Sequence, residues 1–192
     1  MSQASASLIR ISILPLLLLL AMPASVSSQG RIRLQLEEGM SGAVWDITQS
    51  PDGKTLYSCG RDSSAKSWNL GTGECMRMYR PVRPTLVTSI ALDYTGTYLA
   101  AGDMNGVLSV WNARSGVLYY SAPAHEQYVT DVAILPDGKS VLTAGRDGKI
   151  KRWNLDDGAP LETLDAEMQW VQTLAVAPDG TSFAAGGQNG HV

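Results

Sequence analysis

Residues 136–154 read PDGKSVLTAGRDGKIKRWN, and the pattern of this stretch recurs along the chain with a nearly fixed period. Its Trp153, which is followed by asparagine, matches Trp68 and Trp111 at steps of 43 and 42 residues. Two sets of glycines keep the same period, namely Gly53, Gly96, Gly138 and Gly180, and Gly73, Gly116 and Gly158. Because three independent markers agree, the 192-residue chain is predicted to be an array of repeats.

Each repeat resolves into four short strands separated by tight turns. In the third repeat we expect strands over Val129–Leu135, Ser140–Ala144, Ile150–Asn154 and Leu161–Leu164. Asp-Gly pairs lie between them, and in such turns the Asp side chain caps the turn while Gly takes a positive φ. Turns at this spacing indicate antiparallel strands. A repeat of about 40 to 45 residues with this pattern is typical of a β-propeller, in which each repeat supplies about one four-stranded blade.

The repeats predict an all-β propeller of four-stranded antiparallel blades that forms an incomplete ring. Residues 31–36 alternate polar and apolar, as an N-terminal closing strand would. Propellers need about four complete blades, whereas this chain holds about three and a half, so we expect a fragment of a longer protein. In this open arc Phe183 and Val171 should lack a neighbouring blade. Exposed strand edges pair with other chains, so the chain alone is expected to oligomerise or aggregate. The expected blades are approximately 37–80, 81–121, 122–165 and a truncated 166–192.

The first 28 residues stand apart from the repeats. Arg10 is the only charged residue among them, and an apolar stretch over residues 11–21 precedes several small residues. This order is typical of a secretory signal peptide, with cleavage expected after Ser27 or Ser28. A spanning helix needs about 20 apolar residues, so stable membrane insertion is not expected. An uncleaved anchor and a mispredicted gene start are the alternatives.

Export would place Cys59 and Cys75 in a compartment that permits disulfides. The repeat puts them on the second and fourth strands of one blade, with the third strand between. Two inter-strand spacings are roughly 9–10 Å, whereas the Cα atoms of a disulfide usually lie within about 7 Å. We therefore expect two small buried residues, with a disulfide as the alternative.

The first strand of each repeat breaks the alternation of apolar residues at one position. In the third repeat two residues separate Val129 from Val132, but one separates Val132 from Ile134. An extra residue of this kind indicates a β-bulge, which turns a side chain towards the rim of the sheet. The residues expected to point towards one mouth of the ring are Trp45, exposed at the rim, with Thr88, Thr130 and Gln172.

Taken together, residues 31–192 resemble the WD-repeat family, and the third repeat matches the family pattern most fully. The resemblance implies a hydrogen-bonded relay that stiffens the blade. Its members here would be His125, Thr143, Asp147 and Trp153. The other repeats keep only part of it, as Ser58, Asp62 and Trp68 in the first and Trp111 in the second. Departures from the pattern are Met40, Arg83, Ala101, Asn105, Glu167, Ala185 and Asn189.

The relay side chains could also be taken for an activated nucleophile, since Thr143, His125 and Asp147 are the required types. We interpret them as structural, because a triad also needs a cleft and an oxyanion site. Only two histidines exist and no Cys-x-x-Cys occurs, so no metal site and no cofactor are expected. A catalytic role is therefore not predicted for this chain.

A partner-binding face is predicted at the rim that carries the bulges and the Arg-Asp turns. The types enriched at interface hot spots are Trp, Tyr and Arg. The residues proposed for this face are Trp45, Arg61, Met104, Tyr128, Arg146 and Trp170. A second cluster, Arg77, Arg80 and Arg83, is interpreted as a solvated segment, with contact to an acidic partner as the alternative.

Two hypotheses for function follow. The first is a non-catalytic, secreted or periplasmic scaffold that binds a protein or peptide. The second is the propeller portion of a larger exported enzyme, and a wrong gene start would instead favour an intracellular, cytoplasmic or nuclear, assembly scaffold. A net charge of −3 argues against a nucleic-acid partner, which usually requires a basic face. No small-molecule substrate is indicated.

Overall fold

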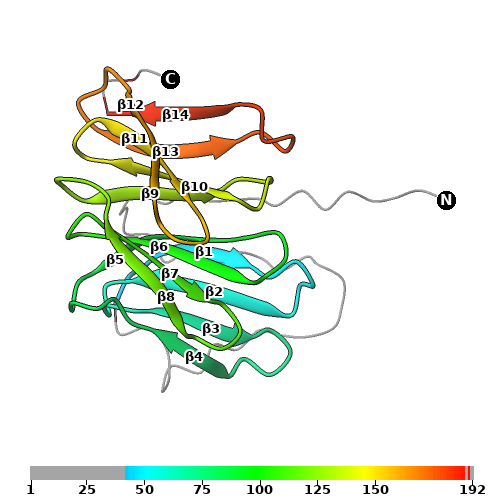
Figure 1. Cartoon of the computed structure of the whole chain (residues 1–192). Helices are drawn as coiled ribbons and strands as arrows, with labels where there is room; N and C mark the ends of the chain where they lie inside the picture. Colours follow the sequence, from blue (N-terminus) through cyan, green and yellow to red (C-terminus); the bar gives the residue numbers. More distant parts are fainter. Residues whose placement is uncertain (1–41, 189, 191–192) are drawn as a thin grey trace.

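The computed structural model describes residues 42–188 and 190, and this part of the chain is built from antiparallel strands (Figure 1). The first sheet comprises β1 (Val44–Gln49), β2 (Thr55–Gly60), β3 (Ala65–Asn69) and β4 (Cys75–Tyr79). The second comprises β5 (Val87–Leu92), β6 (Tyr98–Asp103), β7 (Val107–Asn112) and β8 (Leu118–Pro123). The third comprises β9 (Val129–Ile134), β10 (Ser140–Gly145), β11 (Lys149–Asn154) and β12 (Pro160–Asp165). The last comprises β13 (Val171–Val176) and β14 (Phe183–Gly187).

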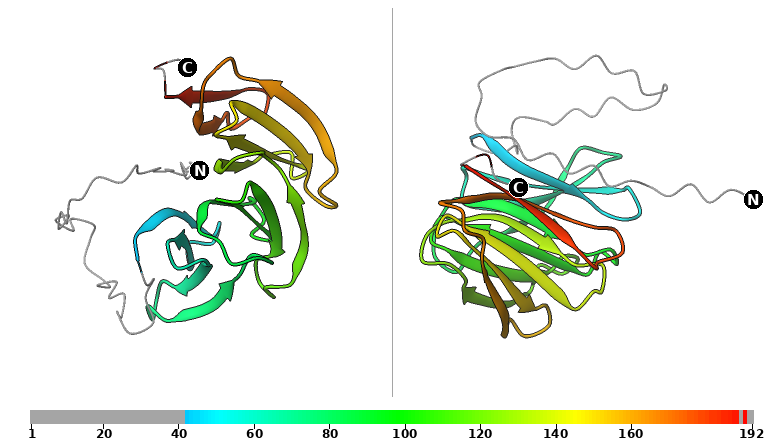
Figure 2. Two further views of the ribbon diagram at one scale, coloured as in Figure 1. Left: turned by 90° about the vertical axis from the view of Figure 1, so that its left-hand side faces the viewer. Right: turned by 90° about the horizontal axis from the view of Figure 1, so that it is seen from above.

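In each sheet the strands are hydrogen-bonded in chain order, and the sheets follow one another as the blades of an incomplete propeller. The first strands of the four sheets, β1, β5, β9 and β13, contact one another in succession. Figure 1 shows the sheets stacked in chain order, and Figure 2 shows them fanning out around a common side. The predicted all-β class and the open ring are confirmed, and the strands of the third repeat lie within one residue of their predicted bounds. The expected closing strand at residues 31–36 and Met40 lie outside the described residues.

The core lies between neighbouring blades. At the first junction the ring of Tyr79 on β4 packs against Trp111 of the next blade, with their ring centroids 6.1 Å apart. At the second junction Trp153 joins Val110 and Val129 in one buried cluster. Thus a tryptophan from the third strand of one blade packs against the blade before it, which explains why this residue keeps the period.

The junction between blades three and four is more open. It is built from a smaller buried cluster that includes Leu142, Ile150 and Val171. Beside it lies a cavity of about 120 Å³ whose lining includes Leu164 and Phe183. Phe183 is exposed as expected, but the expectation for Val171 is wrong: it is fully buried because β13 packs on β9 and β10. Within the described residues, β14 pairs only with β13.

The two cysteines lie as the repeat predicts, on β2 and β4 with β3 between them, and they are not joined by a disulfide. Cys59 is fully buried. Cys75 is only half-buried, so the expectation of two buried cysteines is wrong for this residue. The reason is its place at the start of the outermost strand of the blade, where most side chains of β4 face solvent.

Candidate functional site

The relay residues of the third blade lie within hydrogen-bonding distance of one another. The indole Nε1 of Trp153 donates to the Oγ1 of Thr143 at 3.0 Å. The Nε2 of His125 lies 2.8 Å from the same oxygen, and its Nδ1 lies 2.9 Å from the Oδ1 of Asp147. Because the Asp147 carboxylate is an acceptor, Nδ1 carries the proton, and Nε2 accepts from the Thr143 hydroxyl. The chain of donors therefore runs from Trp153 to Thr143, His125 and Asp147 and ties the segment before β9 to β10, to β11 and to the turn between them.

The electrostatics of the relay favour a neutral imidazole. Burial lowers the pKa of His125 from its ordinary value, and this effect outweighs the opposing attraction of Asp147. Burial also opposes ionisation of Asp147, but its interactions with His125 and the amide N–H groups of Lys149 and Glu126 hold the pKa of Asp147 below its ordinary value. A neutral His125 and an ionised Asp147 are the states that the donor chain requires.

We expect acid to destabilise the protein through His125. Because its pKa is lower in the folded state, the unfolded chain binds more protons as the pH falls below about 6.5, so stability decreases until the folded pKa is reached. Urea unfolding at pH values from 7.5 to about 5 measures this decrease. His191→Gln leaves His125 as the sole histidine, and His125→Gln in that background should flatten the curve over this range. Identical slopes in the two variants would contradict the account.

The other blades replace the relay in different ways. In the first blade Trp68 Nε1 donates to the Oγ of Ser58 at 2.8 Å, and the Nζ of Lys66 pairs with the Oδ2 of Asp62 at 2.8 Å. The ammonium of Lys66 thus supplies Asp62 with a cationic partner. In the second blade Trp111 lies opposite the strand that carries Ala101, which has no hydroxyl group, and it is held by packing instead.

The proposed rim residues lie at one end of the blades, and three of them occupy equivalent positions after the second strand. The backbone amides of Arg61, Met104 and Arg146 donate to the carbonyls of Ala43, Leu86 and Tyr128, with N···O distances of 3.0–3.1 Å. This shared bond joins the turn after the second strand to the start of the first strand in each blade. All of these residues therefore lie at the same end of their sheets.

Three of the six predicted rim residues come together across the junction of blades three and four. The Arg146 guanidinium lies over two rings, with its Cζ 3.7 Å from the centroid of Trp170 and 5.2 Å from that of Tyr128. Tyr128 is 37% exposed, and the other two are half-buried. We call Tyr128, Arg146 and Trp170 the stacked rim cluster.

The remaining three lie on the first two blades. Arg61 is exposed and Met104 is half-buried. Trp45 occupies the bulge of β1, but it is half-buried, so its predicted exposure is wrong. At the equivalent bulges the hydroxyls of Thr88 and Thr130 donate to the carbonyls of Val129 and Val171 in the next blade. A side chain at this position turns towards its neighbouring blade, which accounts for the partial burial of Trp45.

A second polar network, which the sequence reasoning missed, links the inner strands. The Oγ of Ser89 lies 2.9 Å from the Oδ2 of Asp46 and 2.9 Å from the Oδ1 of Asp131. The other oxygen of Asp131 accepts from the Leu174 amide at 2.6 Å and the Thr173 hydroxyl at 3.3 Å. We call Asp46, Ser89, Asp131 and Thr173 the inner ladder. Its members are spaced 43, 42 and 42 residues apart, so the period itself could have revealed it.

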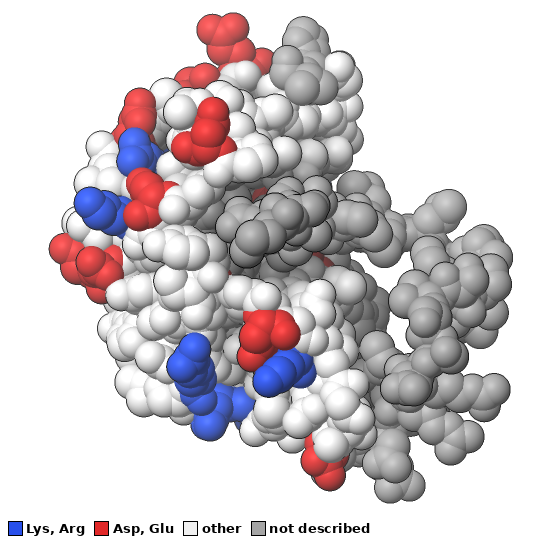
Figure 3. Space-filling view, turned by 90° about the vertical axis from the view of Figure 1, so that its right-hand side faces the viewer, with Lys and Arg blue, Asp and Glu red and all other residues white. Residues whose placement is uncertain are grey.

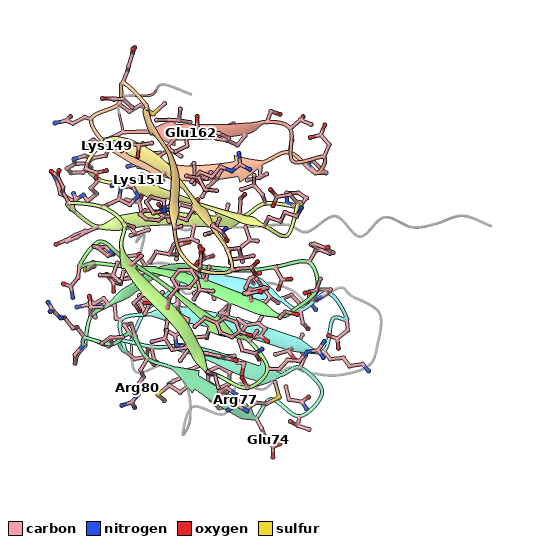
Figure 4. The ribbon with its side chains drawn as sticks, viewed as in Figure 1. Glu74, Arg77, Arg80, Lys149, Lys151 and Glu162 are labelled. Atoms are coloured by element: carbon pink, nitrogen blue, oxygen red, sulfur yellow. The ribbon has the colours of Figure 1, made fainter. Side chains whose placement is uncertain are left out.

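Other classes of site receive no support from the described part of the chain. Between residues 42 and 188 no three His, Cys, Asp or Glu side chains lie close enough to bind a metal, and no helix could cross a membrane. Arg77 and Arg80 extend from the outer edge of the first blade (Figure 4). On the face drawn in Figure 3 basic and acidic side chains are interspersed rather than gathered into one basic area.

The sequence matches the family model "WD domain, G-beta repeat" three times, over residues 30–69, 73–112 and 116–154. The second and third matches begin near the outer strand of one blade and end with the third strand of the next. Sequence repeat and structural blade are therefore out of phase by about one strand. The structure is also similar to one titled "Structure of U3-55K", with a TM-score of 0.64 and 24% identity over 67% of this chain and 41% of that one. This likeness concerns the fold.

Curated relatives match over shorter stretches. A coronin-like protein of Saccharomyces cerevisiae is 37% identical over 70 residues, which are 36% of this chain and 10% of the relative. Subunit I of eukaryotic translation initiation factor 3 from Aspergillus fumigatus is 33% identical over 69 residues, or 36% of this chain and 20% of the relative. The matched stretch thus spans a fifth or less of the length of these relatives.

Proposed function

Because the chain belongs to the WD-repeat family, we propose that it is a non-catalytic scaffold that binds a protein or peptide partner at the rim of its propeller. The observation that carries this proposal is the stacked rim cluster, in which Arg146 lies over Trp170 and near Tyr128. These are the residue types that contribute most to binding at protein interfaces.

The blade beneath the cluster supports a binding role because it is rigid. Arg146 directly precedes Asp147, whose carboxylate is held by His125 and by the amides of Glu126 and Lys149. The turn that presents the guanidinium is therefore fixed before a partner arrives. Pre-organised side chains lose less conformational entropy on binding, which favours affinity.

The arrangement of the relay favours a structural role over catalysis. The Thr143 hydroxyl is fully buried, and it is occupied by both Trp153 and His125. A nucleophile must reach its substrate, whereas this oxygen is enclosed within the blade. The relay is therefore assigned to blade stability, and the rim to binding.

We expect Tyr128→Ala combined with Arg146→Ala to reduce partner capture at least tenfold, because the double substitution removes two hot-spot side chains. Capture from native extract, with quantitative mass spectrometry, measures this loss. Tyr94→Ala with Arg114→Ala is the matched control, since both residues are exposed in turns at the opposite end of the blades. Proteins lost with the rim variant but kept with the control would be the partners. Equal capture by all three forms would place the binding surface elsewhere.

We further propose that the scaffold is exported, on the strength of the signal-like pattern in residues 1–28. N-terminal sequencing of the protein from its native source tests this part separately. A mature start at Ser28 or Gln29 is expected. A start at Met1 or Ser2 would favour the intracellular assembly scaffold.

A further inference from the structure

We propose that Arg146 recognises a carboxylate side chain, Asp or Glu, in the peptide that binds the rim. This inference rests on the proposed function and specifies the chemistry of the partner. Arg146 would then determine one property of the ligand, the charge of the side chain that it binds. The partner is then an acidic segment rather than an apolar or basic one.

The stacking of Arg146 leaves its hydrogen-bond donors available. With its Cζ 3.7 Å from the Trp170 ring centroid, the guanidinium uses a face for the aromatic contact. Its N–H groups lie in the plane of the guanidinium and point away from its edges, so the contact through the face does not use them. The backbone of Arg146 is held by the carbonyl of Tyr128 at 3.0 Å, so the direction of the side chain is constrained from its root. A planar fork of this kind matches a carboxylate with two parallel hydrogen bonds.

The charge of Arg146 is not neutralised by the described residues. No carboxylate within residues 42–188 forms an ion pair with it. Its neighbour Asp147 is committed to His125 and to two backbone amides. A half-buried guanidinium without a counter-ion gains from an incoming anion, because partial desolvation strengthens their attraction.

The size of the positive charge favours a carboxylate over a phosphate. The stacked rim cluster contains one cation, and the two nearby rings are neutral. A phosphate group carries about −1.5 to −2 charges at neutral pH and is usually bound by several basic side chains. One guanidinium and one carboxylate form a balanced pair. The equivalent arginine, Arg61, lies two blades away, in the first sheet.

The stack also joins two blades, because Arg146 follows β10 and Trp170 precedes β13. A purely structural stack would tolerate any peptide, with no preference for charge. A purely structural role and a carboxylate-binding role for Arg146 therefore differ in the peptide preference that they predict rather than in the stability that they predict. Reversing the charge at position 146 separates them.

Selection from a displayed library of random peptides, on the immobilised full chain, tests the proposal. The unsubstituted chain should enrich peptides with Asp or Glu at one fixed position. Replacing that residue with Gln or Asn in a selected peptide should weaken binding about 10- to 100-fold. Arg146→Glu should instead enrich Lys or Arg at that position, whereas Arg114→Glu, at the opposite end, should keep the acidic preference. A phosphopeptide version of the selected sequence should bind no better than the Glu version.

The failures of this inference and of the proposed function are distinguishable. The selected peptides could compete with each other and lose binding on Tyr128→Ala, yet show no acidic preference. That result would overturn only the role of Arg146. Tighter binding of the phosphopeptide would overturn the choice of a carboxylate. If no selected peptide depends on Tyr128, Arg146 or Trp170, both this inference and the proposed rim function are wrong.

Discussion

Trp153→Ala should lower the free energy of unfolding by about 3–5 kcal/mol, the usual cost of deleting a buried tryptophan. Trp153 is 5% exposed and packs with Val110 and Val129 across the junction of blades two and three. Its indole also donates to Thr143, so the substitution creates a cavity and breaks the relay at once. Urea unfolding followed by circular dichroism measures the change.

Two other tryptophan variants serve as controls for this prediction. Trp45→Ala should cost much less, because Trp45 is half-buried at the rim. Trp153→Phe keeps an aromatic ring but removes the indole donor, and it should fall between the two. Equal losses for Trp153→Ala and Trp45→Ala would contradict the assignment of Trp153 to the core.

Asp131→Ala should destabilise the junction between blades three and four by about 3 kcal/mol, since each buried donor left without a partner costs about 1–3 kcal/mol. Asp131 is fully buried, and it accepts from the amides of Val132 and Leu174. It is also within reach of Ser89 in the preceding blade. Loss of its carboxylate leaves the Leu174 amide without this acceptor and breaks the link to Ser89, although Ser89 keeps Asp46 and the Val132 amide keeps the Ser89 hydroxyl.

Amide hydrogen exchange locates this effect. In the Asp131→Ala variant the amide of Leu174 should exchange much faster, while that of Leu99, on β6 of the second blade, should change little. Asp131→Asn is the closest control in shape. It keeps one acceptor oxygen but turns the other into a donor that faces either Ser89 or Leu174, so it should also destabilise. An Asn variant as stable as the unsubstituted chain would show that the carboxylate is not required.

The fold could be predicted from the sequence because its signals are local. Each turn between the first and second strands of a blade carries its own glycine, and Gly53, Gly96, Gly138 and Gly180 all take φ values between 65° and 70°. The break in the pattern of β9 correctly predicted the bulge at Thr130. These features depend on residues a few positions apart, so spacing along the chain reveals them.

The contacts between blades could not be predicted as well, because they join residues about one repeat apart. An open arc predicts that Val171 lacks a neighbouring blade, but the packing of β13 on β9 and β10 is enough to bury it. The half-burial of Trp45 has the same origin. The inner ladder was available in the spacing, yet Asp131 and Ser89 differ in type, and their link appears only when neighbouring inner strands are placed side by side.

The rim was an intermediate case. Its six residues were selected by type and by position in the repeat, and the structure places them at one end of the blades. Arg146 lies over Trp170 because β13 packs against β9. Residue spacing does not reveal this contact between strands. The prediction thus identified the surface, whereas the structure identified the cluster within it.

Hydrogen–deuterium exchange on the chain with and without its captured partner is the measurement that tests the binding rim most directly. The account predicts slower exchange over residues 126–128, 146–148 and 168–170 when the partner is bound. Exchange over the turns at the opposite end, residues 94–96, 114–116 and 156–158, should stay unchanged. Protection confined to those opposite turns, with none at the stacked rim cluster, would contradict the proposal.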